Sequence, residues 1–197
     1  MSITVVKLGG SLMRSSELTD WLDTIQSLAA KTTIIIVPGG GEFADKVREM
    51  QSLTGFDDQV AHRLALLAMS QYGYVLAGMN QSLQLVEDFD KLSSSLGRKI
   101  PLLWLPMTLM KDETEIPASW DFTSDSIALW LAIKLAANKL VLVKAKAFKQ
   151  SEISLAEHMM NGDLDKGFQK LTGRYQGEIH VINKSHCQQL QKLTLDQ

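Results

Sequence analysis

Two glycine-rich segments of this sequence each follow a short apolar run, and both could bind phosphate groups. The first is Lys7-Leu8-Gly9-Gly10-Ser11, directly after the β-branched run at residues 3–6. Glycines at such a place let backbone N–H groups approach an anion, and Lys7 can reach the same anion as a point charge. A tight turn beside a lysine that extends to solvent is the alternative interpretation. The segment is not a P-loop, because the G-x-x-x-x-G-K-[ST] spacing is missing.

The second segment is Pro38-Gly39-Gly40-Gly41-Glu42, again directly after a β-branched run. Consecutive glycines are entropically costly, and a turn needs only one of them. A ligand that lies against the backbone explains the series better. In open α/β sheets, ligands bind outside the carboxyl ends of the strands. Two glycine loops after neighbouring strands are therefore expected to frame one crevice.

A third polar segment, Thr123-Ser124-Asp125-Ser126, precedes an apolar helical pattern. It is fully explained as a helix N-terminus, with Thr123 or Ser124 as the N-cap and Asp125 favourable in the first turn. Asp125 could equally hold lysine ammonium groups beside a phosphate. The residues alone leave both interpretations open.

The elements that must position these segments alternate between strand and helix. The apolar runs at 3–8 and 32–37 predict buried strands, and the three- and four-residue spacing at 18–28 predicts a helix between them. Further strands are expected at 82–86, 100–105, 139–143 and 178–182, and further helices at 43–50, 57–79, 88–96, 124–137, 155–160, 163–171 and from about 185. The helix at 124–137 is expected to be amphipathic, and 107–120 is expected to be turn-like. This order predicts an α/β fold, a single three-layer αβα domain over residues 1–197 with a mainly parallel central sheet.

The composition restricts the function classes. The chain has 197 residues, of which 45% are hydrophobic, and its 20 Lys+Arg and 22 Asp+Glu give a formal charge of −2. The apolar content argues against disorder, and the lack of basic excess argues against nucleic-acid binding. No apolar run approaches the roughly 20 residues that span a bilayer, and the N-terminus lacks the pattern of a secretory signal. The single cysteine, Cys187, excludes an internal disulfide and a cysteine-based zinc site, so we expect a cytoplasmic protein.

Together the three motifs resemble those of the amino-acid kinase superfamily, which contains carbamate, acetylglutamate, aspartate, uridylate and isopentenyl phosphate kinases. Its members carry a K-x-G-G-S segment, a G-G-G loop after the second strand and a T-[ST]-D-x-x-A helix start in this order. Here these are Lys7-Leu8-Gly9-Gly10-Ser11, Gly39-Gly40-Gly41 and Thr123-Ser124-Asp125-Ser126-Ile127-Ala128. The resemblance covers the chain up to about residue 145.

Within that superfamily, residues 37–73 are most similar to the small kinases of methanofuran biosynthesis in methanogens and methylotrophic bacteria. The similarity lies in VPGGGEFADKVR and DDQVAHRLALLAMSQYG. Those kinases phosphorylate an (aminomethyl)furanmethyl phosphate to its diphosphate. The resemblance thus implies ATP as donor, Mg²⁺ carried on the ATP phosphates rather than held by a protein metal site, and a small phosphomonoester bearing an amine as acceptor. It also implies a homo-oligomer.

The chain departs from the family after the strand at 139–143. The T-D-V-D-G-V-Y sequence that lines the nucleotide site is replaced by Lys144-Ala145-Lys146-Ala147-Phe148-Lys149, and the later G-M-x-x-K segment is absent. Lys144, Lys146 or Lys166 could replace the lysine of that segment. Lys146 and Lys149 could equally belong to a solvated basic turn.

The site residues expected from motifs and resemblance fall into three groups. Lys7 and Asp125 are expected to be catalytic, Lys7 contacting the transferring phosphates and Asp125 orienting lysines rather than acting as a base. Nucleotide contacts are expected from Lys7, Gly9, Gly10, Ser11, Ser126 and Lys144, and acceptor contacts from Gly39, Gly40, Gly41, Asp58, His62, Thr123 and Ser124. Asp58 or Glu42 would bind the amine, and His62 the phosphate or a polar group of the furan side.

Three other interpretations bear on function. A family relative that has lost nucleotide binding would act as a ligand sensor or a partner subunit, and the missing G-M-x-x-K segment favours it. A kinase for another small carboxylate or phosphate is the alternative among enzymes. A dinucleotide-binding protein is disfavoured, because no G-x-G-x-x-G follows a strand.

Overall fold

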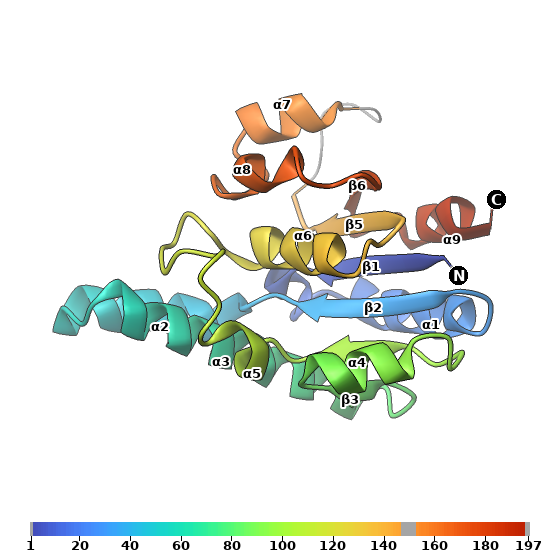
Figure 1. Cartoon of the computed structure of the whole chain (residues 1–197), viewed down its shortest axis with the longest axis horizontal. Helices are drawn as coiled ribbons and strands as arrows, with labels where there is room; N and C mark the ends of the chain where they lie inside the picture. Colours follow the sequence, from blue (N-terminus) through green and yellow to red (C-terminus); the bar gives the residue numbers. More distant parts are fainter. Residues whose placement is uncertain (1, 147–152, 196–197) are drawn as a thin grey trace.

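Six parallel strands form one sheet in the order β3-β4-β2-β1-β5-β6 in the computed structural model, which describes residues 2–146 and 153–195 (Figure 1). The strands are β1 (Ile3–Leu8), β2 (Thr33–Pro38), β3 (Gln84–Val86), β4 (Leu102–Trp104), β5 (Lys139–Lys144) and β6 (Glu178–Asn183). Each strand expected from the apolar runs is present, although β3 and β4 are shorter than expected. Lys149 of the basic segment lies outside the described residues.

The helices occupy both faces of this sheet, which confirms the predicted three layers. They are α1 (Glu17–Ala29), α2 (Gly41–Thr54), α3 (Asp58–Met79), α4 (Phe89–Ser95), α5 (Met107–Met110), α6 (Ser124–Lys134), α7 (Leu155–Met160), α8 (Phe168–Thr172) and α9 (Cys187–Leu195), with a 3₁₀ turn at Gly10–Leu12. The segment 107–120, expected to be turn-like, begins with a one-turn helix, α5, and continues in turns and bends.

Alternate side chains of the central strands enter two separate cores. Val5 and Ile35 pack with α4, α6 and α8, whereas Val6 and Ile36 pack with α1, α9 and the second half of α3. A parallel sheet covered on both faces needs apolar residues at nearly every strand position. This explains the continuous β-branched runs of β1 and β2, all of whose residues are buried.

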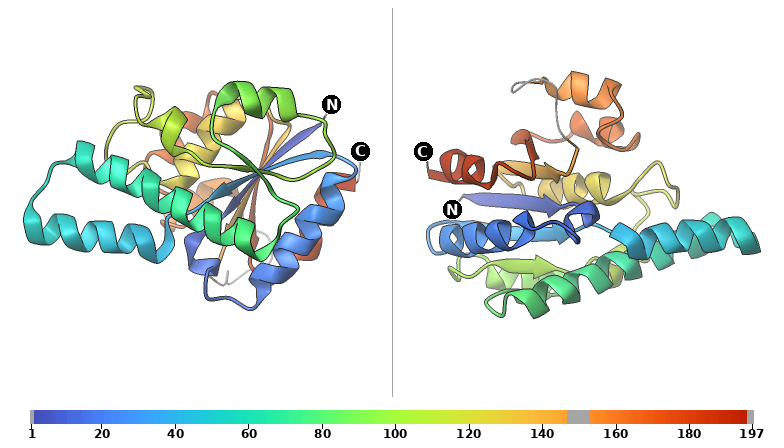
Figure 2. Two further views of the ribbon diagram at one scale, coloured as in Figure 1. Left: turned by 90° about the horizontal axis from the view of Figure 1, so that it is seen from below. Right: turned by 180° about the vertical axis from the view of Figure 1, so that it is seen from behind.

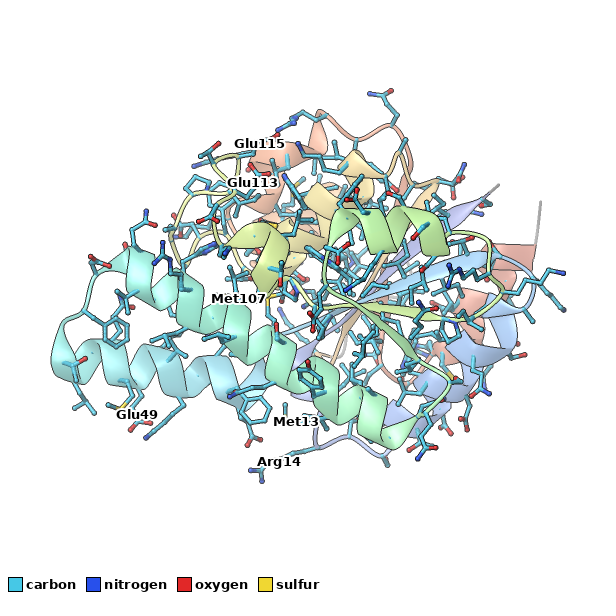
Figure 3. All side chains as sticks on the ribbon, turned by 60° about the horizontal axis from the view of Figure 1, so that its bottom comes forward. Met13, Arg14, Glu49, Met107, Glu113 and Glu115 are labelled. Carbon is cyan, nitrogen blue, oxygen red and sulfur yellow. The ribbon has the colours of Figure 1, made fainter. Side chains whose placement is uncertain are left out.

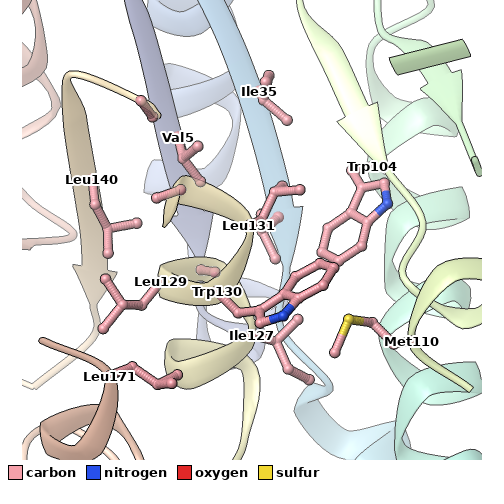
Figure 4. Close-up of a cluster of buried hydrophobic side chains, with 14 of the residues drawn as sticks. Val5, Ile35, Trp104, Met110, Ile127, Leu129, Trp130, Leu131, Leu140 and Leu171 are labelled. Atoms are coloured by element: carbon pink, nitrogen blue, oxygen red, sulfur yellow. The ribbon is translucent and has the colours of Figure 1, made fainter. Parts of the chain in front are cut away.

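Helix α6 differs from the amphipathic helix expected at 124–137. Its residues from Asp125 to Ala132 are all buried, and it ends at Lys134, before Ala136 takes a left-handed conformation with φ 46°. The helix lies over β1, β2 and β5 and is covered from outside by α8 and the segment around α5. On it, Trp130 stacks on Trp104 of β4 with ring centroids 6.2 Å apart, next to Met110 (Figure 4).

The strand register brings the two glycine loops together. Lys7 pairs with Val37 and Leu8 with Pro38 in parallel strands, so both loops leave the same edge of the sheet. The hairpin of α2 and α3 projects beyond this edge, away from the two chain ends (Figure 2). Within the described residues, no helix is both long and apolar enough to cross a membrane.

Candidate phosphoryl-transfer site

The two glycine loops pack directly against each other. A Cβ atom on Gly10 would lie 2.1 Å from the Cα of Gly41, and one on Gly39 would lie 2.5 Å from the amide nitrogen of Gly10. Gly41 also has a φ of +54°, which favours glycine. A close approach between the loops therefore accounts for these glycines, in addition to the ligand contact inferred from the sequence.

A buried aspartate at the same edge joins two lysines. Oδ1 of Asp125 lies 2.9 Å from Nζ of Lys7, and its Oδ2 lies 2.6 Å from Nζ of Lys144. The side chains of Asp125, Lys7 and Lys144 are 6%, 7% and 15% exposed, so the cluster is nearly dehydrated. Lys7 comes from β1, Lys144 from the end of β5 and Asp125 from the first turn of α6. The register of β1 with β5 places the two lysines, and the packing of α6 on these strands places Asp125.

The charges in this cluster depend on one another. Burial alone would raise the pKa of Asp125, but the ammonium groups of Lys7 and Lys144 hold that pKa below its ordinary value. Burial, and then the positive charge of Lys7, lower the pKa of Lys144, and Asp125 offsets part of this effect. The cluster therefore holds two cationic groups and one anion, a net positive charge suited to a phosphate.

Of the three lysines that could replace the absent family lysine, Lys144 is the one that contacts Asp125. Lys146 forms an ion pair with Asp163 and is 63% exposed. Lys166 lies 3.3 Å from Asp121 and is 84% exposed. The backbone of Gly9 lies close to this cluster. A Cβ there would lie only 3.1 Å from the carbonyl oxygen of Val143 and 3.6 Å from Nζ of Lys7.

A cavity of about 280 Å³ opens beside the glycine loops, between α2, α3 and the start of α6. Several of the residues that the sequence predicts at the site line this cavity: Gly10, Ser11, Gly40, Gly41, Asp58, His62, Thr123 and Ser124. Gly9, Gly39 and the Lys7–Asp125–Lys144 cluster are not among the lining residues. The cavity and the cluster are thus adjacent sites connected through neighbouring residues of the same segments.

The two polar side chains expected on α3 both reach the cavity. Asp58 also accepts a hydrogen bond of 2.9 Å from Nε2 of Gln51. His62 has a buried Nε2 without a hydrogen-bond partner, and burial lowers its pKa against a smaller opposing effect of the Met110 carbonyl. Glu42, the other residue considered for the amine, forms an ion pair with Arg14 and does not line the cavity.

Sequence reasoning missed several cavity residues, notably Arg48 and Trp120. The guanidinium of Arg48 lies 4.2 Å from the ring centre of Trp120, whose Nε1 donates to Gln51 over 2.7 Å. Trp120 belongs to the loop after α5, which also carries Glu113 and Glu115 (Figure 3). Arg48 lies on the same face of α2 as Gly41 and Ala44, so its helical spacing from the glycine loop could have indicated that it lines the cavity. No local pattern indicates Trp120.

The start of α6 is occupied by an aspartate from a distant segment. Asp165 accepts hydrogen bonds from the amide and hydroxyl of Thr123 and from the amide and hydroxyl of Ser126. Ser126 is completely buried, so the structure does not bring it to a surface that a nucleotide could contact. The helix expected at 163–171 begins only at Phe168, and Asp165 lies in the turn before it.

The chain belongs to the amino acid kinase family, whose model matches residues 2–100. Among curated proteins, [5-(aminomethyl)furan-3-yl]methyl phosphate kinase of Methanocaldococcus jannaschii is similar, with 29% identity over 140 residues. That match covers 70% of this chain and 63% of the relative's length, so the chain spans less than two thirds of the relative that it matches.

Solved structures of the family share the fold. Uridylate kinase of Archaeoglobus fulgidus superimposes with a TM-score of 0.71 and 16% identity, covering 98% of this chain and 95% of that one. UMP kinase of Ureaplasma parvum gives 0.73 and 14%, covering 100% and 96%. The isopentenyl phosphate kinase of T. acidophilum gives 0.58 and 13%, covering 98% and 95%. The predicted amino-acid-kinase fold is therefore confirmed.

Proposed function

We propose that this protein is an ATP-dependent kinase that transfers the γ-phosphoryl group to a small phosphomonoester, with (aminomethyl)furanmethyl phosphate as the acceptor. The observation that carries the proposal is the pair of lysines held by buried Asp125 at the edge of the sheet where both glycine loops begin. The similarity to the M. jannaschii phosphate kinase supports the choice of acceptor.

On the donor side, Lys7 and Lys144 stabilise the negative charge on the transferring phosphoryl group. Phosphoryl transfer needs in-line positioning and charge neutralisation more than covalent help from the protein. Backbone N–H groups of Gly9, Gly10 and Ser11 bind the nucleotide phosphates. Asp125 orients the two lysines, and since both its oxygens lie against ammonium groups it does not act as a base.

On the acceptor side, the substrate occupies the cavity between α2 and α3. Its phosphate faces the glycine loop Gly39–Gly41 and the start of α6, and His62 donates one hydrogen bond to it. Asp58 faces the amine. An acceptor phosphate is already ionised near neutral pH, so the reaction needs no general base.

Mg²⁺ enters this proposal bound to ATP, where it would neutralise part of the phosphate charge. Among the described residues, no group of three or more His, Cys, Asp or Glu side chains is arranged to hold a metal ion.

The proposal is tested by incubating the protein with ATP, Mg²⁺ and a panel of small phosphates and carboxylates. We expect ATP-dependent conversion of the aminated furan phosphate to its diphosphate. Conversion of a carboxylate but no phosphate would refute the phosphomonoester assignment. Binding of panel members without any turnover would instead favour the non-catalytic relative.

Asp58→Asn is expected to raise KM for the aminated acceptor by about tenfold and to leave KM for the des-amino analogue nearly unchanged, because only the amine loses a charged partner. Steady-state kinetics on both acceptors measure the difference. Asp45→Asn is a control, since Asp45 also lines the cavity but pairs with Arg48. An equal loss on both acceptors would show that Asp58 does not bind the amine.

The fall of turnover at alkaline pH is expected to follow the loss of the positive charge on Lys144. Since its folded pKa lies below the ordinary 10.5, Lys144 loses its charge at a lower pH than an exposed lysine. We expect kcat to fall on the alkaline side with a midpoint below 10.5, and Lys144→Arg to retain activity to higher pH because arginine stays charged. An unchanged alkaline limb in the arginine variant would assign that limb to another group.

A cytoplasmic location is also part of the proposal, and the single cysteine of the chain fits a reducing compartment.

The proposal further includes a homo-oligomer. Val60, Leu67 and Tyr74 of α3 are exposed at seven-residue spacing and so share one face of the helix. Exposed apolar side chains on one face often mark a contact with another subunit. Light scattering on the purified protein measures its mass, and a monomer would refute the assembly.

A further inference from the structure

One carboxylate links the start of α6 to a segment 39 residues further along the chain. Oδ2 of Asp165 accepts from the amide of Thr123 at 2.8 Å, its hydroxyl at 2.8 Å and the amide of Ser126 at 3.1 Å. Oδ1 accepts from the hydroxyl of Ser126 and, at 2.9 Å, from the amide of Phe168. Asp165 thus takes the place of an N-cap for α6, whose own cap residue Thr123 makes no side-chain capping bond, and it also satisfies an amide of α8.

The neighbouring contacts show how closely the two segments fit. The amide of Gly167 donates to the carbonyl oxygen of Asp121 over 2.6 Å. A Cβ on Gly167 would lie 2.4 Å from Cδ1 of Phe122, so no larger residue fits there without displacing that ring. The segment 165–167 is therefore held against the residues immediately before α6.

The hydrogen bonds of Asp165 hold the residues on either side of Asp125, which contacts both lysines. Asp125 lies in the sequence between Thr123 and Ser126, and Asp165 accepts hydrogen bonds from the amides and hydroxyls of these two residues. A first helical turn without a cap frays readily, and a cap fixes its backbone. The Asp165 charge also acts on Lys144, and it favours the charged form of that lysine.

We propose that Asp165 is a positioning residue for phosphoryl transfer, which fixes the first turn of α6 so that Asp125 holds Lys7 and Lys144 together. This rests on the proposed kinase function. Asp165 acts through Asp125 and touches neither substrate. The residues after β5, where the chain departs from its family, thereby supply a structural support for the half of the site that carries the family motifs.

The experiment compares Asp165→Ala, Asp165→Asn and Asp88→Asn. Asp88 is the matched control, because it caps α4 by accepting from the amide of Lys91 over 2.7 Å and makes no contact with the site. We expect Asp165→Ala to lower kcat by about a hundred-fold, as misplacement of a catalytic group by an ångström does, with a small change in KM for ATP. Asp165→Asn, which retains one acceptor oxygen, should lose less. Asp88→Asn should keep the original kcat and most of its thermal stability, because asparagine also caps helices.

Two readouts do not require activity. Amide hydrogen exchange at Ser126 should accelerate in Asp165→Ala but not in Asp88→Asn, and the Asp125 carboxyl, followed by carbon NMR, should titrate at a higher pH. A folded Asp165→Ala protein with unchanged exchange, titration and kcat would overturn the positioning role. Equal losses of kcat in Asp165→Ala and Asp88→Asn would overturn it too. An unmodified protein without kinase activity refutes the proposed function, while exchange and titration still decide whether Asp165 positions Asp125.

Discussion

Lys7→Ala is expected to lower kcat by about a thousand-fold while the protein stays folded. The ammonium of Lys7 acts on charge that develops in the transition state, so its loss should change KM for ATP much less than kcat. Folding should tolerate the change, because Asp125 keeps its contact with Lys144. Steady-state kinetics and thermal melting on the same preparation measure both effects.

Lys139→Ala is the matched control for this prediction. Lys139 is also a buried strand lysine, but it lies at the opposite end of the sheet, where its Nζ donates to the carbonyl oxygen of Leu193. The control should therefore lose some stability and keep its turnover. Near-normal kcat in Lys7→Ala would show that Lys7 does not stabilise the transferring phosphoryl group.

Asp125→Asn is expected to lower both stability and turnover. It leaves Lys7 and Lys144 facing each other without their anion, and removing one partner of a buried ion pair costs about 3–5 kcal/mol. That exceeds the roughly 0.3–1 kcal/mol of a surface carboxylate at a helix N-terminus, which is the loss expected if Asp125 served only the helix start. We also expect kcat to fall about a hundred-fold or more, because neither lysine is held in place.

The pH dependence of stability provides an independent measurement of Asp125. Its folded pKa lies below the ordinary 3.8, so its stabilising contribution is fully present above 3.8 and is lost as the pH falls through the folded pKa. Unfolding by denaturant between neutral and acid pH should therefore show a smaller loss of stability in Asp125→Asn than in the unmodified protein.

Asp163→Asn is a control for both measurements. Asp163 is also a buried aspartate with two basic neighbours, Lys146 and His158, but it lies away from the glycine loops. It should lower stability and leave kcat nearly unchanged. If Asp125→Asn retained both stability and turnover, Asp125 would be only a residue of the helix start.

Much of the fold was predictable because burial on both faces imposes a simple pattern on the strands. β1 and β2 are continuous β-branched runs, and each ends where its glycine loop begins. The prediction that α6 is amphipathic was wrong, because the helix is covered on every side and has no polar face. Its apolar residues therefore show no helical periodicity that would indicate which side is buried.

The candidate site was predictable where its residues lie in short motifs and not where it depends on contacts between distant segments. The glycine loops and Lys7 follow from short motifs. Asp165 and Trp120 reach the site only through tertiary contacts across 39 or more residues, and nothing beside them in the sequence indicates such a role. Lys144 was one of three candidates until β5 placed it against Asp125.

The interlocked glycine loops also constrain how the protein can move. Since Gly10 and Gly41 leave no room for even a methyl group between their backbones, the two glycine loops, which we propose bind donor and acceptor, cannot move closer together. The smallest separation between two bound substrates is then set by the hydrogen-bonded pairing of β1 with β2 and not by a closing hinge. Any motion that admits substrates must come from surrounding parts such as the Trp120 loop, and a single added carbon at position 10 should alter the spacing of both sites at once.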